Sequence, residues 1–291
     1  MRLTLTISVF TVLLQSCNLV GVQTQEAQFS SNPTISAIQP GQIDEASGVV
    51  DSRSMPGNLW VEEDSGNPND LVLLGHDGKI KGRVPVPNAQ NRDWEDMAMG
   101  PGPQSGVNYI YLGDIGDNNA QYPTCTIYRL PEPKSLTDAV TQVDRITFRY
   151  PDGPRDAEAL LLDPKTSDLW IVTKREENVH LYRLPYPQST TDVITAQAYG
   201  AIPLVSGITG GDISPDGSEI LLRTYLGVLY WKRQGNELLA DVLQKRSYRT
   251  LPYRIEPQGE AVCFDRLGSG YFTLSERNNA AAVSLYYYPR K

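Results

Sequence analysis

The pattern of apolar and polar positions along this chain repeats five times, and each copy predicts short antiparallel strands. A copy begins with a carboxylate and small or apolar residues, passes through a turn rich in Pro, Gly, Asp or Ser, and continues into an apolar strand with a polar end. Such runs, bounded by turn residues, are typical of β-strands. The copies read DEASGVV…GNLWVEED, WEDMAMGPG…NYIYLGD, DAEALLLDPKTSDLWIVTK, GGDISPDGSEILLRT and GEAVCFDRLGSGYFTLSE.

The copies follow one another at intervals of roughly 50 to 60 residues, a spacing that indicates one propeller blade per repeat. We therefore predict an all-β fold, a β-propeller of five four-stranded blades. Six blades are the alternative, if the long second or third repeat contains another. The fifth blade shows three strands, and the strand-like segment from Thr34 to Ile38 can supply its fourth. Closing the ring in this way removes two free sheet edges.

The first 17 residues, MRLTLTISVFTVLLQSC, are typical of a signal peptide. Arg2 precedes a short apolar run that ends at Leu14 and is too short to span a bilayer. The sequence Leu14-Gln15-Ser16-Cys17 resembles a bacterial lipobox, in which Cys17 is lipidated and becomes the new N-terminus. The alternative is an ordinary secretory signal that is cleaved near Thr24.

The rest of the chain divides into a tether and one domain. Residues 18–32 are polar and rich in Gln and Ser, as expected of a tether. Residues 33–291 form the predicted propeller, and no linker-like stretch separates the repeats. Both cleavage alternatives place the mature protein outside the cytoplasm. It is lipid-anchored to the bacterial envelope, at the outer membrane or periplasmic face, in the first case and secreted in the second.

Composition narrows the chemistry. A formal net charge of −8 disfavours broad binding to nucleic acid or to an anionic membrane surface. With two His and three Cys, the chain shows no zinc-ligand spacing, no G-x-S-x-G elbow and no Walker A loop. Cys125 and Cys263 lie in strands of different blades, so we expect two buried thiols and no disulfide.

The carboxylate that opens each copy defines the first candidate site. If these acids share one blade position, they form a ring on the central channel. Clustered carboxylates repel one another, so they must take up protons, spread into water or bind a cation, and Ca²⁺ suits many oxygen ligands. The alternative is that each acid accepts backbone N–H groups of the adjacent blade, with no ion. The candidate metal ligands are Glu45, Glu95, Glu158, Asp212 and Glu260.

The second candidate site lies where the second strands end, at one mouth of the channel. Blades one and two offer acids there, and blades three to five offer bases. Arginine suits bidentate capture of phosphate or carboxylate, and a neighbouring cation would bind the same anion. The alternative is a set of surface ion pairs of little energy. The anion- or substrate-binding candidates are Lys174, Arg175, Arg223, Arg277 and Asp114.

One stretch carries a resemblance to known proteins. NRDWEDMAMGPG, YIYLGDIGDNNA and IYRLPEP, between Asn91 and Pro133, resemble an uncharacterised family of bacterial secreted or envelope propellers. More distantly, the layout is similar to phytase-like propellers and calcium-activated apyrases. That similarity implies Ca²⁺ in the central channel, held by inner-strand acids that correspond to Glu45, Glu95, Glu158 and Glu260. The nucleotide-binding strings of the apyrases are not visible in this chain.

Together these observations favour an envelope-anchored propeller that serves as a binding or scaffold module with Ca²⁺ in its channel. Its partner is expected to be a small molecule or an envelope component. One alternative is a calcium-dependent hydrolase of phosphoesters or lactones. Another is a carbohydrate-binding protein that stacks sugars on aromatic residues, although most of these are expected to pack between blades. Those aromatic residues are Trp60, Trp94, Trp170 and Tyr225.

The N-terminal pattern generates a direct prediction. Because Cys17 follows a short apolar run and precedes a polar tether, we expect a diacylated or triacylated Cys17 and recovery in the membrane fraction. Mass spectrometry of the mature N-terminus checks this. An unmodified N-terminus downstream of Cys17 would contradict it.

Overall fold

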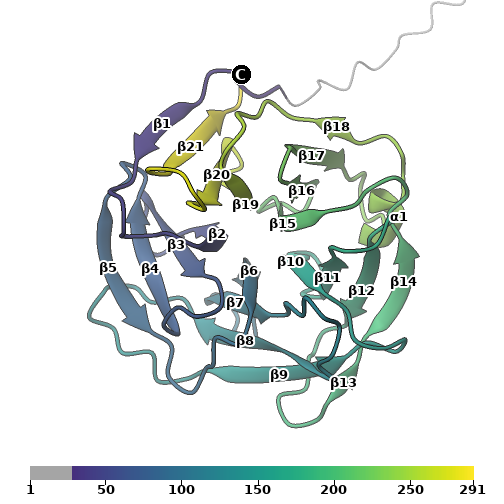
Figure 1. Cartoon of the computed structure of the whole chain (residues 1–291). Helices are drawn as coiled ribbons and strands as arrows, with labels where there is room; N and C mark the ends of the chain where they lie inside the picture. Colours follow the sequence, from purple (N-terminus) through teal and green to yellow (C-terminus); the bar gives the residue numbers. More distant parts are fainter. Residues whose placement is uncertain (1–27) are drawn as a thin grey trace, which may run out of the picture.

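The computed structural model describes residues 28–291, which form five antiparallel sheets arranged around a central axis (Figure 1). Each sheet is one blade whose first strand lies nearest the axis and whose later strands follow outward. The predicted all-β propeller with five four-stranded blades is confirmed, and the alternative of six blades is wrong. The residues before Gln28, including Cys17 of the predicted lipobox, lie outside the described part of the chain.

The strands follow the order expected from the repeats. Blade 1 contains β2 (Ala46–Asp51), β3 (Asn58–Glu63), β4 (Asp70–Gly75) and β5 (Ile80–Pro85). Blade 2 contains β6 (Trp94–Pro101), β7 (Asn108–Asp114), β8 (Cys125–Pro131) and β9 (Asp144–Arg149). Blade 3 contains β10 (Ala157–Leu162), β11 (Leu169–Thr173), β12 (His180–Leu184) and β14 (Gln197–Ala201). Blade 4 contains β15 (Ile208–Ile213), β16 (Glu219–Thr224), β17 (Gly227–Lys232) and β18 (Arg249–Thr250).

Two short elements lie outside the repeat pattern. Strand β13 (Ile194–Thr195) pairs in parallel with β9 and so adds a fifth strand to the outer edge of blade 2. Helix α1 (Leu239–Leu243) lies between β17 and β18 and buries Leu239, Ala240, Val242 and Leu243. Its apolar residues join the cluster between blades 3 and 4, which explains why a helix forms in a chain of strands.

Blade 5 is completed from the other end of the sequence. It contains β19 (Gln258–Phe264), β20 (Gly270–Glu276) and β21 (Ser284–Pro289), and β1 (Thr34–Ala37) pairs antiparallel with β21. The predicted closing strand is therefore confirmed. Phe29 adds to the closure, because its ring packs edge-on against Tyr271 with centroids 4.9 Å apart.

The core consists of apolar layers between neighbouring blades. The indole rings of Trp60, Trp94 and Trp170 are fully buried in these layers, so they pack the fold and cannot stack on a sugar. Cys125 and Cys263 are buried free thiols, as predicted. Among residues 28–291, no helix has the length and apolar character that crossing a membrane requires.

The closing strand can be tested by truncation. A protein that begins at residue 28 keeps both Phe29 and β1, whereas one that begins at residue 39 exposes the edge of β21. We expect the first to remain soluble and monomeric and the second to aggregate, because an unpaired edge strand recruits other chains. Size-exclusion chromatography and thermal unfolding compare them. Equal behaviour of the two proteins would show that β1 does not stabilise the ring.

Candidate functional site

A β-bulge at the same step of every inner strand aims one side chain toward the channel. In each blade the pairing of the first and second strands skips one residue near the start of the inner strand. A bulge of this kind re-aims the side chain of the extra residue. The bulged residues are Ser47, Glu95, Glu158, Thr209 and Glu260. Three of the five predicted acids therefore share the expected position, while blades 1 and 4 place hydroxyl residues there.

The other two predicted acids lie elsewhere. Glu45 precedes the bulge by two residues, is exposed, and accepts a hydrogen bond of 2.7 Å from the Asn67 amide. Asp212 follows the bulge of blade 4 and accepts backbone N–H groups from Ile213 and Phe264, each at 2.8 Å. The predicted ring of five acids is therefore wrong. Asp212 instead fits the alternative prediction, in which an acid accepts a backbone N–H group of the adjacent blade.

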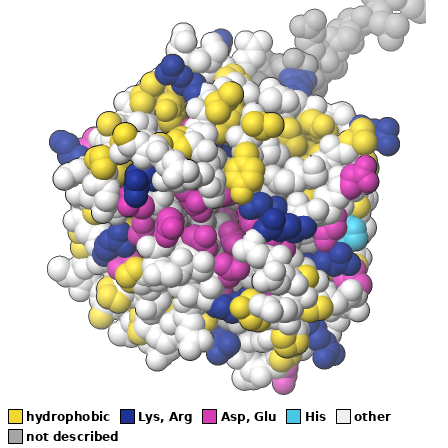
Figure 2. Space-filling model, viewed as in Figure 1, with side chains coloured by type: hydrophobic (Ala, Val, Ile, Leu, Met, Phe, Trp, Pro, Cys, Tyr) yellow, Lys and Arg dark blue, Asp and Glu magenta, His cyan; other side chains and the backbone are white. Residues whose placement is uncertain are grey.

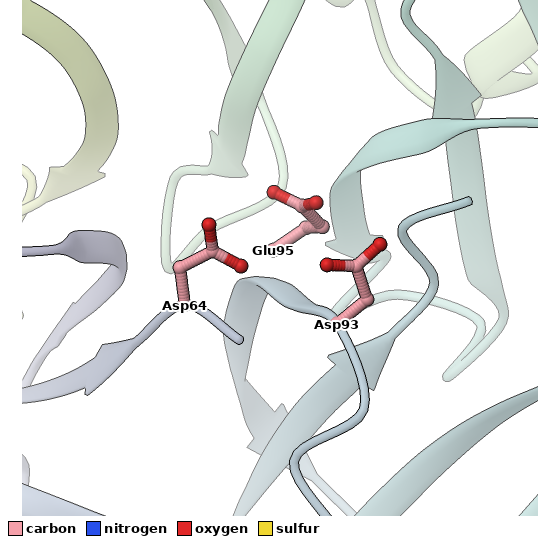
Figure 3. Close-up of side chains that lie close together, drawn as sticks. All are labelled: Asp64, Asp93 and Glu95. Carbon is pink, nitrogen blue, oxygen red and sulfur yellow. The ribbon is translucent and has the colours of Figure 1, made fainter. Parts of the chain in front are cut away.

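Acidic side chains from three blades converge at one mouth of the channel, here called the acidic mouth. Carboxylate oxygens of Asp64, Asp93 and Glu95 lie within 4.8 Å of one another, and Glu95 also belongs to a second such group with Asp156 and Glu158. The first three side chains point toward one another (Figure 3). Figure 2 shows acidic side chains gathered at the centre of this face, with basic side chains beside them.

The sequence around Asp93 fixes the first group in place. The Asn91 amide donates to the carbonyl oxygens of Glu63 (2.8 Å) and Asp64 (2.9 Å), which joins blade 2 to the end of β3. The Arg92 guanidinium donates to the carbonyl oxygens of Asp114 and Gly116 in the loop after β7. Side chains on either side of the group are therefore held by hydrogen bonds to backbone, which orients the carboxylates before any ligand arrives.

Gly116 leaves the space that this group needs. A β-carbon at Gly116 would lie 2.3 Å from Glu95 Oε1 and 2.5 Å from Asp93 Oδ2. Any other residue would push these two carboxylates aside. The Asp-Ile-Gly-Asp segment after β7 therefore supplies a close backbone approach to the acids, which explains its glycine.

The two acidic groups differ in their cations. The Lys174 ammonium pairs with Glu158, and the Arg175 guanidinium pairs with Asp156 at 2.5 Å, so two of the three acids of the second group have a cationic partner. Among the described residues, no Lys or Arg forms an ion pair with Asp64, Asp93 or Glu95. Glu95 is only 7% exposed, and no described residue donates a hydrogen bond to it. A carboxylate in this state takes up a proton, contacts water or binds a cation.

Burial and mutual repulsion raise the pKa values of the cluster. Burial, and then the charges of Glu158, Asp64 and Asp93, raise the pKa of Glu95 well above its usual value. Burial raises the pKa of Asp93 to about 6 and that of Glu158 to about 8, although Lys174 opposes the second shift. Burial raises the pKa of Glu260 to about 7 and, with repulsion from Glu260, that of Glu276 to about 8.

The basic residues predicted for this mouth lie in different places. Lys174 lies beside the acids and stacks over the Tyr225 ring at 5.1 Å, and Arg175 lies next to it. Arg223, in contrast, is fully buried and pairs with the equally buried Glu256 at 3.0 Å, so it does not line the mouth. This is a correction: the end of β16 turns its arginine inward, under blade 5, where its N–H groups bind the carbonyl oxygens of Ala261 and Leu274.

The two remaining candidates for anion binding, Arg277 and Asp114, both interact with other residues of the protein. Arg277 pairs with Asp44 at 2.7 Å across the seam of blades 5 and 1, which is the surface ion pair weighed as the alternative. Asp114 is buried and accepts the backbone N–H of Asp93 at 2.9 Å, so it positions the acidic group. Of the predicted anion-binding residues, only Lys174 and Arg175 lie beside the acidic mouth.

Three acids of the cluster, Asp64, Asp93 and Asp156, were absent from the sequence-based candidates, although the sequence contains a signal for the last two. Asp93 and Asp156 each precede the bulged glutamate by two residues, within the repeated pattern Arg-Asp-x-Glu of blades 2 and 3. Glu45 stands at the same offset before Ser47. Aligning the copies on this pattern, and not on their first carboxylate, separates the bulged position from the one before it.

Comparisons with known proteins identify no family for this chain. No family model matches this chain, and no curated protein matches it. Among solved structures it is similar to the Neurospora crassa Pan2 WD40 domain, with a TM-score of 0.43, 9% identity, and coverage of 91% of this chain and 98% of that one. It is also similar to Kuenenia stuttgartiensis hydrazine synthase, with a TM-score of 0.39, 10% identity, and coverage of 86% and 96%. The five blades of the structure make the chain a β-propeller, and its resemblance to a bacterial envelope family stays a prediction.

The raised pKa values predict how the free energy of unfolding depends on pH when a chelator is present. Glu158, Glu260 and Glu276 bind protons in the folded chain at pH values where the unfolded chain has lost them. Stability should therefore be greatest at low pH and fall as pH rises from about 5 to about 8. Urea unfolding at several pH values measures this slope. Glu276→Gln should make this decrease with pH smaller, and the exposed control Glu177→Gln should leave it unchanged. A free energy of unfolding that increases from pH 5 to pH 8 would contradict the assignment.

Proposed function

We propose that this protein is an extracytoplasmic binding module whose acidic mouth holds one Ca²⁺ between Asp64, Asp93 and Glu95. The observation that carries this proposal is the Glu95 carboxylate, which is buried, lacks a hydrogen bond from the described residues, and points at two other carboxylates. A divalent cation would satisfy all three groups at once and remove their mutual repulsion.

The donor set fits a hard cation. Three carboxylates offer up to about six oxygens, and Ca²⁺ accepts 6–8 oxygen ligands in flexible geometry. Neither His nor Cys belongs to the acidic groups of the described residues, which disfavours zinc and copper. Asp64 and Asp93 are partly exposed, so the ion would face the channel mouth and keep positions for water or for a ligand.

Two neighbouring features define what such a site would bind. The Lys174 ammonium and the Arg175 guanidinium lie on the blade 3 side of the acids, so positive groups stand beside the proposed ion. A cation and an arginine side by side suit a carboxylate or phosphate ligand. The signal-like N-terminus supports a location outside the cytoplasm, where Ca²⁺ is abundant enough to fill weak sites.

Chelation tests the proposal. Because the ion binds only the folded protein, saturation at about 100 times the dissociation constant adds about 2.7 kcal/mol to the free energy of unfolding. EDTA should then lower the melting temperature by roughly 5 to 10 °C. Glu95→Gln should abolish this shift, and calorimetric titration should show one site in the wild type and none in the variant.

Asp212→Asn is the matched control. Asp212 is a partly buried acid of an inner strand whose oxygens already accept two backbone N–H groups. Its replacement should cost about 1–3 kcal/mol of stability but leave the chelator shift intact. A wild-type protein that is insensitive to EDTA would overturn the calcium site. Calcium-dependent turnover of a phosphoester or lactone would convert the binding module into the hydrolase alternative.

A further inference from the structure

A pocket opens on the seam between blades 5 and 1, on the face of the ring where the inner strands β2 and β19 end. It has a volume of about 330 Å³ and lies between the end of β2, the turn after β4, the loop between β19 and β20, and β21. The charged, polar and aromatic side chains that line it include those of Asp51, His76, Asp265, Arg266, Phe272 and Tyr287. We propose that this pocket binds a small carboxylate with an apolar or aromatic body, independently of the calcium site.

Aromatic rings form the apolar wall. The Phe272 ring lies 4.6 Å from the Tyr287 ring and 4.6 Å from the His76 imidazole, measured between centroids. Leu267, which is 70% exposed, borders the same space. Three flat groups in a row and one aliphatic side chain suit a planar or short apolar body, and the volume limits the ligand to a small molecule.

The two acids of the pocket already have their hydrogen bonds. Asp51 accepts from the Arg266 backbone N–H at 2.7 Å and contacts His76 Nε2 at 2.8 Å. Asp265 accepts from the Tyr287 hydroxyl at 2.6 Å and from the backbone N–H groups of Leu267 and Ser269. Their oxygens are therefore already hydrogen-bonded within the fold, and neither acid calls for an added cation.

The unused hydrogen-bonding capacity suited to an anion is that of one donor group. Arg266 is exposed, and its guanidinium has no hydrogen bond or ion pair among the described residues. His76 donates its Nε2–H to Asp51, so the Nδ1 of the neutral ring is an acceptor, and the ring contributes to the pocket as a flat wall. A guanidinium offers a planar pair of N–H groups that matches a carboxylate, so the pocket places an anion receptor beside an aromatic wall.

Binding of phenylacetate to the full-length protein, compared with its neutral analogue phenylacetamide, tests the proposal. We expect saturable shifts of the NMR signals of Phe272 and Tyr287 and an affinity for the acid at least about tenfold above that for the amide. Arg266→Gln should lower the affinity for phenylacetate by about tenfold or more and leave that for the amide unchanged. The exposed control Arg246→Gln should change neither.

Three outcomes would overturn the proposal. They are equal affinity for acid and amide, an unchanged affinity in Arg266→Gln, and the absence of saturable shifts at millimolar phenylacetate. Inorganic phosphate that binds as tightly as phenylacetate would show a plain anion site without use of the aromatic wall, and would also overturn it. Glu95→Gln should bind phenylacetate like the wild type, so the two sites succeed or fail separately.

Discussion

The close approach of the five inner strands at the axis is the constraint on which the rest of this structure depends. A β-carbon added at Gly48 would lie 2.7 Å from the backbone nitrogen of Met97, and one at Gly210 would lie 2.7 Å from the carbonyl oxygen of Glu260. Neighbouring blades therefore touch through their backbones. Asp96, which is fully buried, accepts N–H groups from Leu160 in blade 3 and Gly211 in blade 4, at 2.9 and 3.1 Å.

Such a narrow axis forces each acid on an inner strand to find a partner. Asp96 and Asp212 use backbone N–H groups, and Glu158 uses the ammonium of Lys174. Glu95 has neither kind of partner, although it stands at the same bulge as Glu158 one blade away. The difference arises at the ends of the second strands, where blade 3 continues past Thr173 into Lys174 and blade 2 continues past Asp114 into Ile115 and Gly116. Blade 2 therefore supplies no base at the position that Lys174 occupies in blade 3.

The two faces of the ring consequently carry different unpaired groups. At the acidic mouth these are carboxylate acceptors, and in the pocket between blades 5 and 1 the group without a partner among the described residues is the guanidinium of Arg266. A propeller can separate such groups because each inner strand runs from one face of the ring to the other. Residues near the start of the strand lie at one face, and residues beyond its end lie at the other.

The sequence by itself determined the architecture, because strand periodicity and turn residues are local properties that repeat in every blade. The five blades, the closing strand at Thr34 and the buried thiols could all be predicted in this way. The site was only partly predictable: Glu95, Glu158 and Glu260 were found, but Glu45 and Asp212 were assigned to a position that Ser47 and Thr209 occupy. Tertiary structure decided this, since a bulge shifts the register by one residue and leaves no mark in the pattern of apolar residues. It also decided which charges meet: Arg223 turned inward to Glu256, and the carboxylates of Asp64 and Glu95 were brought together only by the packing of blade 1 against blade 2.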